Sequence, residues 1–410
     1  MGLGDAVAAN AAFEQAEQVD SYCCFPNRLD DVNVLTLATT VNPDGARAPY
    51  YLGCLYYDKR QYDLAIHYWE RAARLDPSFP TVWRNLALAR YNKQGKEDEA
   101  QEYMERAFHL DETDARMLME LDQLYKHLHR PHKQRLDFLQ LHAELVGRRD
   151  DLVLEEITLL NQTGRYEEAM QKLDAHTFHP WEGGEGKVPA QYQICRVELA
   201  KQAIAAKNYE KAVKLLGECL EYPHHLGEGK LYGAQENDFY YLLGIAYEAM
   251  AEAGSSAQCS ELKTKAVTCF KQATKGPQEP AAAMYYNDAK PDKIFYQGLA
   301  LYKLGRDDEA HGRFYKLINY GKQHVFEKQV MDYFAVSLPD LLIWEKSAEQ
   351  GTSELDTKNV IHCKYMLALG YYGMGDTQRA ERFLSEVEAL DNNHQGIQQL
   401  RTLISTIGLC

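Results

Sequence analysis

Residues 51–80, YLGCLYYDKRQYDLAIHYWERAARLDPSFP, share their pattern with residues 85–114, NLALARYNKQGKEDEAQEYMERAFHLDETD. The second stretch carries one extra residue in its turn. The aligned positions are Leu52-Gly53 with Leu86-Ala87, Ala65 with Ala100, Trp69 with Met104, and Ala72 with Ala107. Small residues let two helices approach closely, and large apolar residues fill the gaps between them. The pattern therefore predicts two copies of a helix–turn–helix unit.

This pattern resembles the tetratricopeptide repeat, a helix–turn–helix unit of about 34 residues. The resemblance implies an all-α fold, a right-handed α-solenoid in which each repeat packs only on its neighbours. We expect about eight repeats and a partial one. Weaker copies lie near residues 115–147, 161–173, 195–221, 240–275, 295–317 and 364–391, and the partial copy lies at 34–49.

The repeats predict four parts of the chain. Residues 1–47 hold N-terminal helices and the partial repeat, and residues 48–177 hold regular repeats. Residues 178–320 hold repeats with long glycine-rich connections, and residues 321–410 hold C-terminal helices with a final repeat. Inside the last part, YFAVSLPDLLIWEKSAE (333–349) fits no repeat, and we expect a helix there that begins near its proline.

Composition excludes several classes of function. The formal net charge is −15 and no basic block is present, which argues against nucleic acid and against an anionic membrane surface as partners. The nine cysteines are scattered and include no Cys-x-x-Cys, which is typical of reduced thiols in the cytoplasm. No signal peptide and no apolar run long enough to span a bilayer is present.

Three unusual connections each precede the first helix of a repeat. They are FHPWEGGEGK (178–187), PHHLGEGK (223–230) and AMYYNDAKPD (283–292). Equivalent loops stack along one edge of a solenoid, so we expect these three to be neighbours. Their candidate ligand-binding residues are His179, Trp181, Glu182, Glu185, Lys187, His224, His225, Glu228, Lys230, Tyr285, Tyr286, Asn287 and Asp288.

Two interpretations of these loops stay open. Carboxylates, histidines and aromatic rings on glycine-rich backbone are suited to hold a sugar or a peptide, or to perform acid–base chemistry. Alternatively, the Glu and Lys side chains pair with each other and the loops are only tight turns. A phosphate-binding loop is excluded, because Trp181 and Val188 stand where that motif needs Gly and Ser or Thr.

The first helices of the repeats predict a partner-binding groove. Arg and Tyr are frequent hot-spot residues at interfaces, although some of these side chains would instead pack on the next repeat. We expect no cofactor and no metal site, because the HLHRPH histidines (127–132) lack acidic or thiol companions. The groove candidates are Arg47, Tyr50, Tyr57, Arg84, Tyr91 and Arg116.

Several longer strings resemble one family more closely, among them DPSFPTVWRNLALARYNK, FHPWEGGEGKVPAQY and LGEGKLYGAQENDFYYLLG. They resemble the C-terminal repeat region of large, mostly bacterial proteins that carry an N-terminal β-sandwich domain of unknown function and are found beside carbohydrate-utilisation genes. This sequence lacks a β-sandwich region, and we expect it to be a separate C-terminal piece or to start late.

Two hypotheses follow. The first is a scaffold without catalytic activity that binds a protein or peptide partner, or a separate β-sandwich domain. The second is a carbohydrate-active module whose site is formed by the Gly-Glu-Gly-Lys loops, with catalytic residues unknown. An open pocket with two carboxylates about 5–10 Å apart would favour the second.

Overall fold

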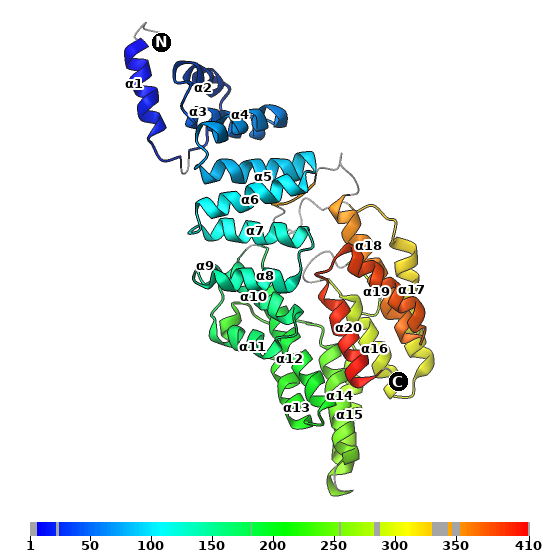
Figure 1. Cartoon of the computed structure of the whole chain (residues 1–410). Helices are drawn as coiled ribbons and strands as arrows, with labels where there is room; N and C mark the ends of the chain where they lie inside the picture. The colour runs from blue at the N-terminus through cyan, green and yellow to red at the C-terminus, as the bar shows by residue number, and fades with distance from the viewer. Residues whose placement is uncertain are drawn as a thin grey trace. The chain divides into compact units, whose positions relative to one another are not determined.

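The computed structural model describes residues 6–21, 24–181, 183–253, 256–282, 288–329, 343–346 and 353–408. Within these ranges the secondary structure is entirely helical: α-helices and one short 3-10 helix, with no strand (Figure 1). Successive helices pack on one another in antiparallel pairs along the chain. The prediction of an α-solenoid of helical repeats is confirmed.

The chain forms two compact units, and each is described here by itself. Unit 1 comprises Met1–Leu128 together with Leu342–Gly351, and unit 2 comprises His129–Leu341 together with Thr352–Cys410. Unit 1 therefore includes one short segment that comes from far along the sequence. The four parts of the chain expected from the repeats stay predictions.

Unit 1 is a stack of helices packed in chain order from α2 to α7. Figure 1 shows α5, α6 and α7 lying side by side. Its helices are α1 (Ala6–Glu17), α2 (Leu29–Val41), α3 (Arg47–Asp58), α4 (Tyr62–Leu75), α5 (Pro80–Gln94), α6 (Glu97–Leu110) and α7 (Ala115–His127).

The small residues of the repeat are needed for close helix contact. A Cβ atom at Gly53 on α3 would lie 2.3 Å from Cδ1 of Trp69 on α4, so a larger residue there would push the two helices apart. The other small positions of this repeat, Ala65 and Ala72, are fully buried. Unit 2 repeats the glycine–aromatic contact at Gly244 with Phe270 and at Gly298 with Phe314.

Local signals set the ends of α5 and α7, the two helices that carry the candidate site. Pro80 is the first residue of α5, where its missing N–H costs nothing, and Gly95 ends the helix with a left-handed φ of 64°. The Asp114 side chain caps α7 by accepting hydrogen bonds from the backbone N–H groups of Arg116 and Met117. The local sequence thus sets both ends of α5 and the start of α7.

Unit 2 continues the helical pairs and ends with a helix that folds back on an earlier one. α20 packs on α12, and the buried residues of α20 are Ile397, Leu400 and Leu403. The helices are α8 (His132–Leu141), α9 (Ala143–Val146), α10 (Asp150–Gln162), α11 (Tyr166–Ala175), α12 (Lys187–Ala205), α13 (Tyr209–Glu218), η1 (His224–Leu226), α14 (Asn237–Ala253), α15 (Ser256–Ala273), α16 (Pro291–Lys303), α17 (Asp307–His324), α18 (Glu354–Gly373), α19 (Thr377–Leu390) and α20 (Gln395–Ile407).

One expectation about secondary structure is corrected. The helix expected within residues 333–349 falls mostly outside the described residues, but residues 343–346 are described and are not helical. Their backbone groups bond to a side chain of α5 instead of to one another. Among the described helices, none combines the length and the apolar character that crossing a bilayer requires.

Candidate functional site

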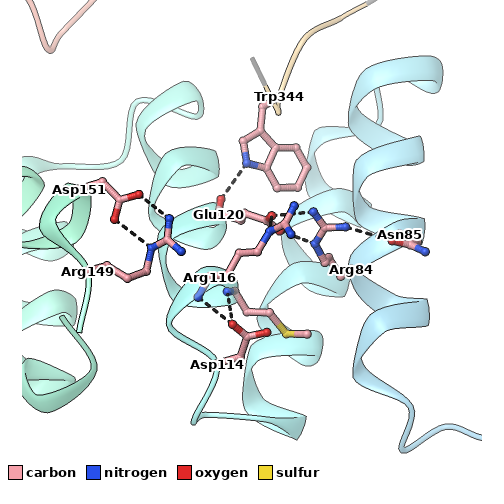
Figure 2. A network of polar contacts seen from close by, with 9 residues as sticks. Arg84, Asn85, Asp114, Arg116, Glu120, Arg149, Asp151 and Trp344 are labelled. Atoms are coloured by element: carbon pink, nitrogen blue, oxygen red, sulfur yellow. Dashed lines mark hydrogen bonds and ion pairs between the residues drawn. The ribbon is translucent and has the colours of Figure 1, made fainter. Parts of the chain in front are cut away.

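The face of unit 1 formed by α5 and α7 holds the non-helical segment 343–346. Trp344 of this segment is 1% exposed, so almost its whole side chain is buried. Its indole lies edge-on to the Tyr91 ring, with centroids 5.5 Å apart, and its Nε1 donates a hydrogen bond of 2.8 Å to the backbone carbonyl of Glu120 (Figure 2). A buried indole N–H needs such an acceptor, and α7 supplies it.

Asn92 on α5 holds the backbone on both sides of this tryptophan. Its Nδ2 donates to the carbonyl of Ile343 at 2.8 Å, and its Oδ1 accepts from the backbone N–H of Glu345 at 2.9 Å. An amide side chain offers one donor and one acceptor in a fixed geometry, and here both are used. Asn92 thus recognises peptide backbone, whatever the neighbouring side chains are.

Lys346 completes the contacts of the segment. Its ammonium lies 5.3 Å from the centre of the Tyr91 ring and forms an ion pair with Glu97. Both side chains of the pair are more than two fifths exposed, so the pair contributes less free energy to holding the segment than the burial of Trp344 does. We call Tyr91, Asn92, Glu97 and Glu120, which contact the segment, the tryptophan seat.

A network of charges fixes Glu120 between the two helices. Its carboxylate is fully buried and accepts hydrogen bonds from Arg84 on α5, at 2.6 Å from Nη2, and from Arg116 on α7, at 2.9 Å from Nε (Figure 2). Burial alone would lower the pKa of Arg84, but the hydrogen bond and charge of Glu120 outweigh it and raise that pKa. The guanidinium therefore stays charged, and the paired network joins α5 to α7 beneath Trp344.

The groove candidates divide into two places. Arg84, Tyr91 and Arg116 belong to the seat or to the network below it. Tyr57 adjoins them: burial raises its pKa, the charge of Tyr62 raises it further, and a hydrogen bond with Asn92 lowers it in part.

Tyr50 and Arg47 of the groove candidates meet a different residue, Phe79. Tyr50 is 6% exposed and packs on the Phe79 ring at 4.8 Å, inside the hydrophobic cluster of unit 1. The Arg47 guanidinium lies 3.9 Å from the centre of the same ring.

Sequence reasoning missed Asn92, Glu97 and Glu120 of the seat, and Trp344 of the segment that lies in it. Neither a motif nor a spacing marks Asn92 or Glu120, which lie in the first helices of their repeats. Trp344 had one signal, its position in an apolar string that fits no repeat. Its contact with Glu120 joins residues 224 positions apart, which no local pattern predicts.

In unit 2, the two Gly-Glu-Gly-Lys loops lie against each other, as their equivalent slots in the repeats led us to expect. Glu228 Oε2 accepts a 2.8 Å hydrogen bond from the backbone N–H of Gly186, and the Phe178 N–H donates to the carbonyl of His225 at 2.8 Å. Gly227 has a φ of +75°, and a Cβ there would lie 2.6 Å from the Phe178 carbonyl oxygen. This position therefore requires glycine.

Charged and polar groups of these loops bond to other residues of unit 2. Lys230 pairs with Glu236 and donates to the carbonyl of Leu220 at 2.9 Å. Burial raises the pKa of Glu228, the Gly186 N–H lowers it, and the charge of Glu185 raises it again. The backbone N–H of His179 donates to Asp150 at 2.7 Å. These contacts favour loops that brace one another.

The remaining loop candidates are placed as follows. Trp181 covers Gly184, where a Cβ would lie 2.3 Å from the indole. Glu185 and Asp288 are half-buried, whereas Lys187 and His224 are exposed. In the described part of the chain, no three His, Cys, Asp or Glu side chains come together in a way that could hold a metal ion. Four candidates lie outside the described residues: Glu182, Tyr285, Tyr286 and Asn287.

A comparison with known families matches the region that carries the site. Residues 41–117, which include α3 to α6, match the family model of the tetratricopeptide repeat. The match shows tetratricopeptide repeats in this part of the chain. This fold generally serves as a scaffold for protein interactions, because its stacked helices form extended binding surfaces.

Three solved structures are similar to the chain at low identity. YrrB, described as a TPR protein with an unusual peptide-binding site, is 19% identical over 45% of this chain and 90% of its own, with a TM-score of 0.35. Naa15/Naa10 bound to HypK-THB is 10% identical over 98% of this chain and 66% of that one, with a TM-score of 0.38. A tetratricopeptide repeat protein from Parabacteroides merdae ATCC 43184 is 13% identical over 66% and 91%, with a TM-score of 0.36.

Proposed function

We propose that this protein is an interaction scaffold and that the tryptophan seat of unit 1 binds a peptide segment of a partner protein. The observation that carries the proposal is the pair of hydrogen bonds between Asn92 and the backbone on either side of Trp344, one donated and one accepted by Asn92. Any peptide without proline at the position of Glu345 offers these backbone groups, so a surface that satisfies them and adds a pocket for one side chain has the two parts of a peptide-binding site.

Contacts that do not involve the segment also hold part of the seat in place. Glu120 is held by two arginines from α5 and α7, and both helices have well-defined ends. Binding to a preorganised surface avoids the cost of ordering that surface, which leaves more of the contact energy as affinity. The network below the seat thus supports a binding role as well as stability.

The carbohydrate hypothesis receives less support. Glu228, Lys230 and His179 make contacts within unit 2 that resemble bracing of the loops, and no described contact favours a sugar over this role. A separate β-sandwich domain as the partner stays a prediction from the family resemblance. We therefore propose the scaffold alone.

A selection from a displayed random-peptide library tests the proposal. The bait is the full chain with Trp344→Ala, which vacates the seat, and the control bait carries Asn92→Ala in addition. We expect peptides to be enriched on the first bait and not on the second. Absence of enrichment, or equal enrichment on both folded baits, would overturn the proposal, and circular dichroism verifies that both baits are folded.

A further inference from the structure

We propose that the tryptophan seat is specific for peptides with the sequence Trp-x-Lys or Trp-x-Arg, and that residues 344–346 of this chain occupy it in competition with such a partner. This inference rests on the proposed function, because it names the ligand of the same site. Three consecutive residues, 344–346, contact the seat and indicate what it accepts at each position.

The tryptophan position carries most of the recognition. Trp344 combines a nearly complete burial, an edge-on contact with Tyr91 and a hydrogen bond to the Glu120 carbonyl. Phenylalanine and leucine lack the N–H that this carbonyl accepts, and tyrosine places its hydroxyl elsewhere. Buried tryptophans are typical interface hot spots, so replacement of this residue by alanine in a free peptide should weaken binding by about 30-fold or more.

The middle position is recognised through its backbone only. The side chain of Glu345 is exposed, whereas its N–H donates to Asn92 Oδ1. Any residue with a backbone N–H fits here, but proline does not, because it has no N–H to donate. The middle residue of the motif is therefore unspecified, except that it is not proline. The same difference between proline and alanine provides a matched pair of variants for the experiment.

The third position prefers a cation. Lys346 faces the Tyr91 ring and pairs with Glu97, and an arginine would make the same two contacts. Because this pair is partly exposed, we expect its loss to weaken binding only about two- to five-fold.

The chain's own segment has the features of a ligand held in cis. Of all residues after position 128, only Leu342–Gly351 belong to unit 1. The segment fits no repeat, and its described contacts with unit 1 centre on a single buried side chain. A tethered ligand acts at an effective concentration on the order of millimolar, so a partner peptide must displace it and binds the parent protein at least tenfold more weakly than a protein with a vacant seat.

The experiment compares Glu345→Pro with Glu345→Ala in the full chain. The first removes the backbone N–H that donates a hydrogen bond to Asn92 and so releases the segment, whereas the second keeps that N–H. Binding of a fluorescent peptide with the sequence LLIWEKSA (residues 341–348) is measured by fluorescence anisotropy. We expect the Pro variant to bind this peptide at least tenfold more tightly than the parent, and the Ala variant to bind it like the parent.

Peptide variants test the motif itself. On the vacant seat, the peptide with proline in place of glutamate should not bind, and the peptide with alanine there should bind normally. The motif would be refuted by equal affinity of these two peptides, or by undiminished binding of the peptide that lacks tryptophan. If Glu345→Pro does not fold, Trp344→Ala vacates the seat by a second route and the same peptides are compared on it.

Failure of this inference can be told from failure of the proposed function. Library peptides that depend on Asn92 but lack tryptophan, together with no binding of LLIWEKSA, would overturn the motif and leave the peptide-binding scaffold standing. No Asn92-dependent peptide of any sequence would overturn both.

Discussion

Replacing Glu120 by glutamine separates the stability of unit 1 from its binding site. The substitution keeps the size of the side chain and the backbone carbonyl that accepts the Trp344 indole, but it removes the charge shared by Arg84 and Arg116. Since the two arginines lie on α5 and α7, the variant tests whether this charge holds the helices together.

The expected magnitude follows from the exposure of each partner. The Glu120 side chain is fully buried and that of Arg84 is only 17% exposed, so the substitution leaves a mostly buried cation without a counter-ion. Breaking such a pair costs about 3–5 kcal/mol. Arg116 is 63% exposed, so the loss of its ion pair adds less than about 1 kcal/mol to the loss of stability. Because glutamine still accepts one hydrogen bond, we expect a loss near the lower end, about 3 kcal/mol or about 10 °C in Tm for a unit of this size.

Urea denaturation followed by circular dichroism measures this loss, and two further variants serve as controls. Glu112→Gln removes an exposed carboxylate that pairs with His109 and should change stability by less than about 0.5 kcal/mol. Arg84→Met combined with Glu120→Leu removes both buried charges and should lie within about 1 kcal/mol of the parent. A Glu120→Gln variant as stable as the parent, or a double variant as unstable as the single one, would refute the reasoning.

Two further predictions concern pH and packing. Burial acts to raise the pKa of Asp150, but hydrogen bonds from His176 and His179 together outweigh it and hold that pKa below its usual value. The carboxylate therefore stabilises the fold above about pH 4, and this contribution is lost as the pH falls through the lowered pKa. The stability difference between the parent and Asp150→Asn should therefore be largest near neutral pH and vanish towards about pH 2, and a constant difference in urea midpoints would contradict this. Gly53→Ala places a methyl group against Trp69 and should cost about 1–3 kcal/mol in thermal unfolding, whereas Gly217→Ala on α13 meets open space and should be neutral or stabilising.

The fold was predictable because the packing within each repeat depends on the spacing of residues that are close in the sequence. The spacing from Gly53 to Trp69 fixes which side chains meet between α3 and α4, and the same spacing recurs from Gly298 to Phe314. In a solenoid each helix packs mainly on its sequence neighbours, so a pattern read over a few tens of residues contains most of the packing information. The adjacency of the two Gly-Glu-Gly-Lys loops followed from the same regularity.

The candidate site was only partly predictable, because it breaks that regularity. Arg84 and Tyr91 were expected on the face where they lie, since periodicity assigns a face to every residue of a helix. Trp344 comes from a segment outside the repeats, and Asn92 acquires its role only when that segment is present. Chain positions this far apart are joined by tertiary contacts that leave no trace in local spacing.

In each unit, a segment from late in the sequence packs on earlier helices. The two contacts differ in how much free energy their loss would cost. In unit 2, the fully buried ammonium of Lys201 bonds to Glu198 on its own helix and to the Gln399 carbonyl and Thr402 hydroxyl of α20. Removing α20 would take two partners from a buried charge, so that helix is part of the fold.

In unit 1, by contrast, the buried Glu120 carboxylate takes its partners from α5 and α7 and keeps them when Trp344 leaves. Departure of the segment exposes one aromatic pocket, the Asn92 amide and one carbonyl, all of which water can solvate. The cost is the loss of one hot-spot side chain, a few neutral hydrogen bonds and the partly exposed Lys346–Glu97 ion pair, which a partner with the same chemistry restores in full. An occupant held by replaceable contacts over an intact charge network is one that can be exchanged, and this is why the tryptophan seat, rather than the α12–α20 contact, is the place where we expect a partner to bind.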